Sequence, residues 1–321
     1  MKVTLSLLAI CASAIAAFAA PAQAQQPVTK IVVPFAPGGN TDLVARMIAE
    51  KLGPKLGSTV IVENKTGAGA MIGTDFVAKA APDGHTLLLT TVAHAVTPSL
   101  RKSLPYDSVA DFTPLYIANL APQLMLVSNK VPANTLREFI DLMRANPGKY
   151  QFGSSGTGSA LHIAAELLRQ QAKVDLVHVP YKGTGLAIND VMAGHIDFII
   201  DPISTAAEFA KSGKVKVLAI TSAKRSPLLP NVPTFKESGL PEYEAYTWAA
   251  IVGPKGMKPE VAQKLNQAIA EVMSEPATRK RFIDLGLEPI EKMTLTQAAA
   301  FLRAETQKWA DVIRAANIQP E

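Results

Sequence analysis

Residues 31–42 read Ile-Val-Val-Pro-Phe-Ala-Pro-Gly-Gly-Asn-Thr-Asp and place a glycine turn between an expected strand and an expected helix. The β-branched run predicts a buried strand, the glycines break it, and Asn40 or Thr41 is placed to cap the helix. Backbone N–H groups at such a turn, with the positive end of the helix dipole, bind an anion without a cationic side chain. No lysine or arginine occurs between Ile31 and Thr41. The stretch therefore predicts either a backbone-lined anion site or a tight turn without a ligand.

A second loop repeats this chemistry later in the chain. Residues 153–159 read Gly-Ser-Ser-Gly-Thr-Gly-Ser, follow a short strand expected over 150–152, and open a helix expected over 160–171. Ser159 is a natural N-cap for that helix. The loop adds hydroxyls and again contains no basic residue. We therefore expect two opposing half-sites that close on one small anion, formed by Gly38, Gly39, Ser155, Thr157 and Ser159.

Polar residues also follow two other expected strands. Thr90 and Thr91 lie where the third strand should end, and Asp201 ends a later buried strand. The carboxyl ends of parallel strands share one edge of a sheet, so these side chains should face the same opening as the loops. The threonine hydroxyls are placed either to bind a ligand or to cap the next turn. Asp201 is placed either to accept hydrogen bonds from a ligand amine or hydroxyl or to cap a helix near Ser204.

The segments around these residues alternate between short apolar runs and helical patterns, which is typical of an α/β protein. One helix is expected from Leu43 to about Leu52, where Gly53-Pro54 weakens or ends it. A buried strand is expected over 124–128, and residues 248–252 are a candidate strand crossing back to the first lobe. The last part of the chain predicts helices over 259–274, 277–285 and 295–315.

The start of the chain predicts export. Lys2 precedes an apolar stretch, and residues 22–24 read Ala-Gln-Ala, so residues 1–24 are expected to be a signal peptide that is removed on export to the periplasm. The sole cysteine, Cys11, lies in this leader, and the mature chain therefore cannot form disulfides. A lipid anchor at Cys11 is the weaker interpretation, because the bulky Ile10 precedes it and the leader before it is short.

Composition and spacing argue against several other functions. The length of residues 25–321 suggests two domains, each able to bury a core. The net charge of +5 is spread out and aromatic residues make up 6%, which disfavours nucleic-acid binding because such a surface needs clustered basic residues and stacking platforms. The glycines over 67–73 are spaced too widely for a dinucleotide fingerprint, so no cofactor is expected. The five histidines show no close i, i+4 pair, so no metal site is expected.

One class of enzyme has to be weighed against binding. Ser99 and Lys102 fit the serine-x-x-lysine pattern of penicillin-recognising acyl enzymes, and residues 211–213 fit their later lysine-hydroxyl-glycine element. That serine must open a buried helix, yet Pro105 follows within six residues and leaves no room for one. The middle serine-x-asparagine element is also missing. We therefore expect the chain not to be an enzyme, with an exported serine acyl-enzyme as the alternative.

Several motifs together resemble the receptors of tripartite tricarboxylate transporters, the Bug-type periplasmic solute-binding proteins. The resemblance covers essentially the whole mature chain and rests on residues 33–42, 63–69, 81–84, 152–159, 178–183 and 218–226. It implies an α/β Venus-flytrap fold with a mainly parallel sheet in each of two lobes. Lobe I would be residues 25–126 and 248–321, and lobe II residues 127–247. It further implies a monomer that captures a small carboxylate-bearing solute and hands it to a membrane transporter.

The resemblance also implies the ligand contacts. In the family, loops matching residues 35–42 and 154–159 grip a carboxylate from opposite lobes, partly through ordered water, and His162 matches a histidine just after the second loop. Family members take di- and tricarboxylates, acidic amino acids and aromatic acids, so the resemblance names no single ligand. The family turn Phe-Asp-Asn becomes Ile200-Asp201-Pro202 here, which removes an amide side chain. The candidate ligand-binding residues are Phe35, Ala36, Pro37, Gly38, Gly39, Asp42, Thr90, Thr91, Ser154, Ser155, Gly156, Thr157, Gly158, Ser159, His162 and Asp201.

Among these candidates, Asp42 needs a separate interpretation. A carboxylate that faced the cleft would repel an anion, although an acid early in a helix suits the helix dipole. We therefore expect Asp42 to hold the amides of its own loop in place.

Overall fold

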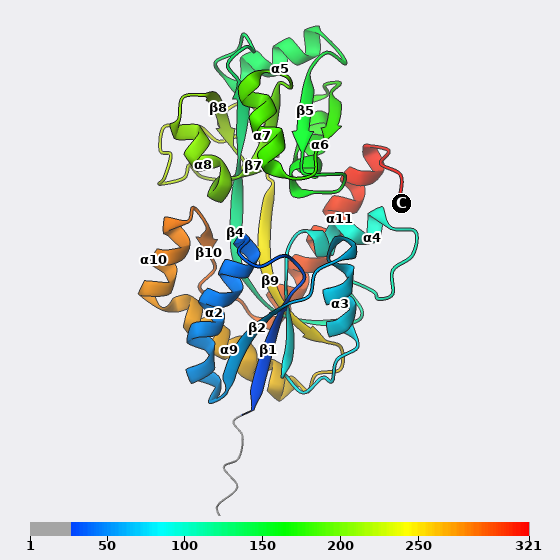
Figure 1. Cartoon of the computed structure of the whole chain (residues 1–321), viewed down its shortest axis with the longest axis vertical. Helices are drawn as coiled ribbons and strands as arrows, with labels where there is room; N and C mark the ends of the chain where they lie inside the picture. The colour runs from blue at the N-terminus through cyan, green and yellow to red at the C-terminus, as the bar shows by residue number, and fades with distance from the viewer. Residues whose placement is uncertain (1–26, 321) are drawn as a thin grey trace, which may run out of the picture.

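The structure, a computed structural model, describes residues 27–320, and the predicted leader over residues 1–24 lies outside them. Figure 1 shows two lobes joined by the long strands β4 and β9. The chain begins with β1 (Val28–Val33), α2 (Asn40–Leu56), β2 (Thr59–Asn64), η1 (Ala68–Ala70), α3 (Met71–Ala78), β3 (Thr86–Thr90), α4 (Ala93–Leu100) and β4 (Phe112–Ser128). It continues with α5 (Leu136–Ala145), β5 (Gln151–Ser154), α6 (Ala160–Ala172), β6 (Val177–Pro180), α7 (Thr184–Ala193), β7 (Phe198–Pro202), α8 (Ile203–Lys211) and β8 (Val215–Ile220). It returns through β9 (Tyr246–Pro254), α9 (Pro259–Ser274), α10 (Pro276–Asp284), β10 (Glu288–Pro289) and α11 (Leu295–Ala315).

A mixed sheet runs through both lobes. Its strand order is β2-β1-β3-β9-β4-β7-β5-β6, and β10 and β8 also pair with β4. In one lobe β1 is parallel to β2 and β3, and in the other β5 is parallel to β6 and β7. β4 and β9 are antiparallel to their neighbours, because the chain crosses between the lobes on β4 and comes back on β9. The expected parallel sheets are therefore found away from the crossing strands, and the crossing pair makes the sheet mixed.

The strand β4 changes partners part of the way along its length. Residues up to Pro122 pair with β9, and residues from Gln123 pair with β7 and β8. The return strand β9 begins at Tyr246. We propose that the lobes divide at these points, close to the boundaries after residues 126 and 247 that the sequence suggests. α11 packs against α4 of the first lobe and α6 of the second, and so spans the division.

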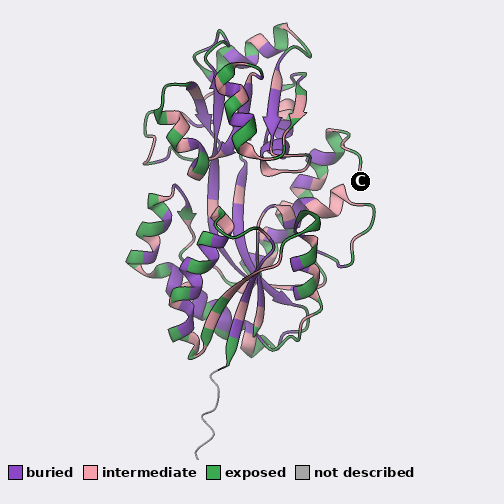
Figure 2. Cartoon of the chain, viewed as in Figure 1, coloured by how far each residue is buried: buried purple, intermediate pink, exposed green. Residues whose placement is uncertain are grey.

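Burial explains why these segments adopt their structures. One face of α5 is buried at helical spacing, formed by Leu136, Phe139, Ile140 and Met143. The Thr135 hydroxyl caps this helix by accepting a hydrogen bond from the Glu138 N–H. β4 is buried on both faces, and its sequence is therefore nearly continuously apolar rather than alternating. Figure 2 shows the buried residues concentrated in the strands and the exposed ones on the outer faces of the helices.

The first long helix differs from the expectation at both ends. α2 has Gly39 as its N-cap and no side-chain cap, so the prediction that Asn40 or Thr41 caps it is wrong. The helix also runs through Pro54 instead of ending there. A proline in the last turn removes only one helical hydrogen bond, and Gly57 then closes the helix in the left-handed conformation.

The predicted Ser159 cap and the C-terminal elements are found, whereas one strand is much longer than expected. β4 begins at Phe112, well before the strand expected over 124–128, and register shifts near Pro114 let it continue past that residue. Ser159 caps α6 as expected, because its side chain accepts from the His162 N–H. β9 and the three C-terminal helices α9, α10 and α11 lie where the sequence predicts them.

Candidate functional site

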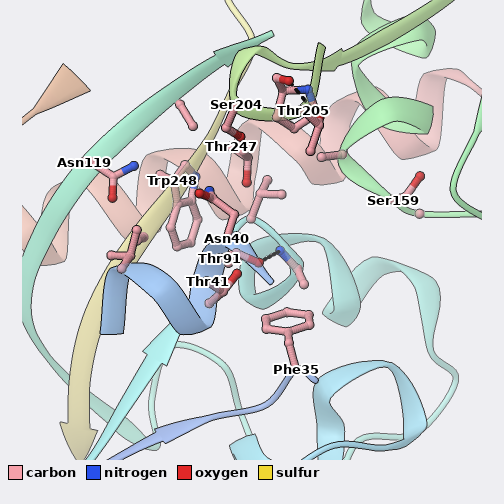
Figure 3. A pocket seen from close by; sticks show the side chains of 18 residues that line it. Phe35, Asn40, Thr41, Thr91, Asn119, Ser159, Ser204, Thr205, Thr247 and Trp248 are labelled. Atoms are coloured by element: carbon pink, nitrogen blue, oxygen red, sulfur yellow. Dashed lines mark hydrogen bonds between the residues drawn. The ribbon is translucent and has the colours of Figure 1, made fainter. Parts of the chain in front are cut away.

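A cavity of about 280 Å³ lies between the lobes. Four helices begin at its wall, and residues at their starts line it: Asn40 and Thr41 for α2, Val92 and Ala93 for α4, Ser159 and Ala160 for α6, and Ser204 and Thr205 for α8. The crossing strands supply Asn119 from β4 and Thr247 and Trp248 from β9, as Figure 3 shows. Among the described residues that line this cavity, none has a charged side chain.

These helix starts give the cavity its electrostatic character. The N-terminus of a helix carries roughly half a positive charge and unpaired N–H groups. Four of them, two from each lobe, begin at the same space, and none of the described residues lining that space has a charged side chain. At α4 the N–H groups of Ala93, His94 and Ala95 already donate to the Thr91 hydroxyl, the Thr91 carbonyl and the Val92 carbonyl. Such a wall favours a small anion over a cation or a neutral ligand.

Two polar side chains at this cavity lack a hydrogen-bond partner among the described residues. Asn119 is 2% exposed and its Oδ1 is unpartnered, and the Oγ of Ser204 is buried and unpartnered. An unsatisfied buried polar atom costs about 1–3 kcal/mol, which a ligand recovers when it pairs with that atom. Sequence reasoning missed both residues as ligand candidates. Asn119 lies within an apolar strand, and Ser204 is recognisable only as the start of a helix.

Asp42 holds the first loop, as expected. It is 3% exposed, and its carboxylate accepts hydrogen bonds from Gly38 N, Arg46 Nε and Asn64 Nδ2, each at 2.9 Å. Asn64 Nδ2 also donates to the Phe35 carbonyl at 3.1 Å. The Arg46 guanidinium lowers the pKa of Asp42 to about 2, so the carboxylate stays ionised near neutral pH. The contact between Asp42 and Arg46 can be predicted from their i, i+4 spacing in the sequence. Asn64 reaches Asp42 only because β2 pairs with β1.

The glycine turn itself lies beside the cavity rather than in its wall. Phe35 lines the cavity, whereas residues 36–39 are exposed and are not among its lining residues. Gly38 has a φ of 82°, a conformation that favours glycine. Gly39 has a φ of −76° and room for a side chain. In this conformation the first turn of α2 faces the cavity, and ligand contact by Ala36, Pro37, Gly38 and Gly39 stays a prediction.

The second loop divides into supporting and cavity-lining residues. Ser154 is fully buried, and its Oγ lies 2.6 Å from His178 Nε2 and 3.1 Å from the Gly156 N–H that donates to it. Ser154 and Gly156 therefore shape the turn. Gly158 and Ser159 line the first cavity, and Ser155 and Thr157 line a second cavity next to it.

His162 supports this loop from behind. Gly158 N donates to His162 Nδ1 at 2.9 Å, so Nδ1 is unprotonated and the proton of the neutral ring is on Nε2. Nε2 lies 3.7 Å from Glu166 Oε1, and Glu166 pairs with Arg169 at 2.6 Å. The His162 ring stacks on His178 with centroids 3.9 Å apart. Burial lowers the pKa of His178 to about 4, so the His178 ring is neutral near pH 7.

The two threonines after β3 take different positions. Thr90 is 1% exposed within the strand and does not line the cavity. Thr91 lines it and also accepts a hydrogen bond from the Ala93 N–H at 3.4 Å. The Thr91 hydroxyl therefore caps the turn before α4, and ligand binding by Thr91 stays a prediction.

Asp201 lies under the start of α8 and is fully buried. Its Oδ2 accepts a hydrogen bond from the Thr205 hydroxyl, and its Oδ1 has no partner among the described residues. Asp201 does not line the cavity, although its neighbour Pro202 does. Burial raises the pKa of the Asp201 carboxyl to about 7.

Replacing Asp201 with asparagine is expected to stabilise the protein at about pH 8 and to change its stability little at about pH 4. The stability contributed by protonated Asp201 is fully present below its unfolded pKa of 3.8 and is lost as the pH rises through its folded pKa of about 7. Asparagine has no proton to lose and avoids this cost. Melting temperatures measured across this pH range test the prediction, and parallel pH profiles for the two proteins would contradict it.

The described residues bear on the other functions considered. Across residues 27–320, no helix combines the length and apolarity needed to cross a membrane. Within the same range, no group of three or more histidine, cysteine, aspartate or glutamate residues is arranged to hold a metal ion. Ser99 lies near the C-terminal end of α4, whereas the acyl-enzyme alternative needs its serine at the start of a buried helix.

Two α/β lobes joined by crossing strands, with a small-molecule cavity between them, define the class of two-lobed periplasmic binding proteins. The family described as "Tripartite tricarboxylate transporter family receptor" matches residues 44–318. The protein BugT of Bordetella pertussis is 37% identical over 287 residues, which cover 89% of this chain and 88% of BugT. A protein from the tcbD-tcbE intergenic region of Pseudomonas sp. (strain P51) is 36% identical over 283 residues, covering 88% of this chain and 84% of that protein.

Solved structures agree with this match. The chain is similar to the periplasmic binding protein BugD, with 34% identity, a TM-score of 0.76 and coverage of 92% of this chain and 99% of that chain. It is similar to an R. palustris protein solved with adipate, with 30% identity, a TM-score of 0.78 and coverage of 91% and 98%. It is also similar to MatC from Rhodopseudomonas palustris, solved with malate, with 34% identity, a TM-score of 0.75 and coverage of 89% and 98%. The chain belongs to the tripartite tricarboxylate transporter receptor family, whose members are solute-binding proteins rather than enzymes.

Proposed function

We propose that this protein captures a small carboxylate-bearing solute in the cavity between its lobes and delivers it to a tripartite tricarboxylate-type membrane transporter. The observation that carries the proposal is the meeting of four helix starts around a cavity without charged lining residues. Their N–H groups and dipoles attract an anion, and the unpartnered Ser204 hydroxyl can donate a further hydrogen bond to it. Adipate and malate in the two R. palustris proteins support a carboxylate as the ligand class.

The architecture suggests how capture would work. The lobes are connected by β4 and β9, and the cavity has walls from both lobes. We expect the lobes to close on the ligand by bending at these crossing strands, as in other hinged binding proteins. The predicted leader over residues 1–24 would place a monomeric mature protein in the periplasm, where a membrane transporter would receive the solute.

Binding should raise the thermal stability of the mature chain, residues 25–321. A ligand at about 100 times its dissociation constant stabilises a folded protein by roughly 2.7 kcal/mol. We expect this effect from one or more carboxylates in a panel of dicarboxylates, tricarboxylates, aromatic acids and amino acids, and none from the matching neutral amides. The protein is first unfolded and refolded by dialysis to remove any co-purified ligand. A flat response from refolded protein with native circular dichroism would contradict the proposal.

A further inference from the structure

A row of three paired side chains lies along one face of α6, behind the second loop. His162, Glu166 and Arg169 are spaced i, i+4 and i+7, which places them on the same face of the helix. We propose that Glu166 is a positioning residue for ligand binding: it fixes the His162 ring so that Nδ1 accepts the Gly158 N–H, which holds the loop in its binding conformation. This inference rests on the proposed function, because it assumes that a carboxylate binds beside this loop.

The three side chains form a continuous chain of contacts that ends at the loop. Arg169 Nε donates to Glu166 Oε2 at 2.6 Å, and the other carboxylate oxygen, Oε1, lies 3.7 Å from His162 Nε2. Gly158 N donates to the opposite ring nitrogen, His162 Nδ1, at 2.9 Å. Gly158 lines the first cavity and the neighbouring cavity of about 320 Å³, so a change in its position alters the walls of both.

Glu166 carries a buried charge that does not face a ligand. It is 7% exposed and lines neither cavity. Burial raises the pKa of its carboxyl, but His162 and Arg169 outweigh this effect and hold the pKa below its usual value, so the carboxylate is ionised near neutral pH. A charge is almost never buried this far unless it is paired. The buried charge acts mainly on His162, which is 3% exposed, whereas Arg169 reaches solvent.

The position of the His162 proton decides whether the ring can support the loop, because a neutral imidazole has one donor and one acceptor. With the proton on Nε2, the ring N–H faces the Glu166 carboxylate and Nδ1 accepts from Gly158. With the proton on Nδ1, two N–H donors oppose each other at Gly158, and a bare lone pair faces the negative charge. The 3.7 Å separation is too long for a hydrogen bond, but a charge at that distance still favours the first tautomer.

Ring stacking cannot make this choice. The His162 ring lies nearly parallel to His178, with centroids 3.9 Å apart, and to Phe152, with centroids 6.1 Å apart. These contacts fix the plane of the ring, but a half-turn of the ring keeps the same plane and exchanges Nδ1 with a carbon atom. Glu166 and Gly158 together therefore decide which nitrogen faces the loop.

The outer end of the chain is anchored to the helix that packs on both lobes. Arg169 Nη2 donates to the Ala316 carbonyl at 3.2 Å, directly after α11. α11 packs against α4 and α6. The guanidinium is therefore held by two acceptors, which fixes the Glu166 oxygen that it contacts and leaves the other oxygen facing His162.

Glu166→Gln tests the positioning role because it keeps the shape of the side chain and removes one acceptor. Arg169 only donates, so it should retain the amide oxygen, and the amide NH2 would then face His162 Nε2 and favour the proton on Nδ1. Isothermal titration calorimetry of the refolded mature protein uses malate, adipate and any other carboxylate that stabilises it in the panel above. We expect Glu166→Gln to bind about tenfold more weakly than the wild type, the effect of about one lost hydrogen bond.

Nitrogen-15 spectra of the histidine rings measure the tautomer directly and without a ligand. The His162 signals are identified by their absence from His162→Gln. The proton should be on Nε2 in the wild type and on Nδ1 in Glu166→Gln.

Adding Arg169→Met to Glu166→Gln provides a rescue. Methionine has no N–H donor, so the amide is free to turn its oxygen toward His162 Nε2. The double variant should regain the wild-type tautomer and an affinity within about threefold of the wild type, which a role in packing alone would not produce. Glu237→Gln is the matched control, because Glu237 pairs with Arg225 at 2.9 Å in the second lobe and lines neither cavity. It should bind like the wild type.

A wild-type His162 proton on Nδ1 would overturn the positioning role without any variant. An unchanged affinity or an unchanged tautomer in folded Glu166→Gln, or a double variant that binds no better than Glu166→Gln, would also overturn it while the proposed function stands. A wild type that binds no carboxylate at all would overturn the proposed function, and the positioning role with it.

Discussion

The protein with Gly158 replaced by valine is expected to fold but to lose ligand binding. Gly158 has a φ of 76°, which a β-branched residue adopts only with strain, and a Cβ at this position would overlap Leu100 of α4 in the opposite lobe. The loop would have to move away from α4, which changes the walls of both cavities. Calorimetry with the best carboxylate should show an affinity loss of about 100-fold or more, equivalent to roughly 3 kcal/mol or more.

A glycine with the same conformation provides the control for this change. Gly256 has a φ of 79°, has no atom within 4 Å of where a Cβ would be, and lines neither cavity. Gly256→Val should therefore show a comparable stability loss from backbone strain while it keeps the original affinity. An unchanged affinity in a folded Gly158→Val protein would exclude this loop from the binding site.

Replacing Glu305 with leucine is expected to reduce the free energy of unfolding by about 2–6 kcal/mol, because it leaves two buried indole donors unpaired at about 1–3 kcal/mol each. Glu305 Oε2 accepts hydrogen bonds from Trp248 Nε1 and Trp309 Nε1, both at 2.8 Å. Each tryptophan is 1% exposed. Trp248 forms part of the cavity wall on β9, so the same carboxylate ties that wall to α11. Urea unfolding of the ligand-free protein measures the loss.

The conservative variant separates the hydrogen bonds from the packing. Glu305→Gln keeps an acceptor oxygen of the same reach and should lose much less stability than Glu305→Leu. Trp248→Phe removes one of the two donors, so adding it to Glu305→Leu should cost less than the sum of the single changes. Equal losses for Glu305→Gln and Glu305→Leu would show that the paired indole groups are not the source of the stability.

Much of the site's local structure follows from short stretches of sequence. The glycine loop before α6, its Ser159 cap and the role of Asp42 in its own loop all depend on residues within a few positions of one another. Capping and turn preferences operate over this range, so they can be predicted without the rest of the fold. The prediction that Asn40 or Thr41 caps α2 also depends on neighbouring residues, and it is wrong because Gly39 occupies the N-cap position.

The positions of residues that are far apart in the sequence depend on how whole helices and strands pack together. Asn119 reaches the cavity because β4 pairs with β9 and crosses between the lobes, and Leu100 lies next to Gly158 because α4 packs close to the second loop. Asp201 ends its strand as expected, yet α8 covers it and keeps it out of the cavity wall.

The sequence by itself therefore determined the family, the α/β class and the positions of the two glycine loops. The structure pairs the Gly38, Gly156 and Gly158 N–H groups of these loops with Asp42, Ser154 and His162, so the expectation that the loop amides are free is wrong for these three. Only the tertiary structure decided that the starts of α2, α4, α6 and α8 meet around one space, and which polar groups remain unpaired there. The physical reason is that hydrogen bonds within a turn involve neighbours along the chain. The burial of a group and its access to a cavity depend on every segment that packs against it.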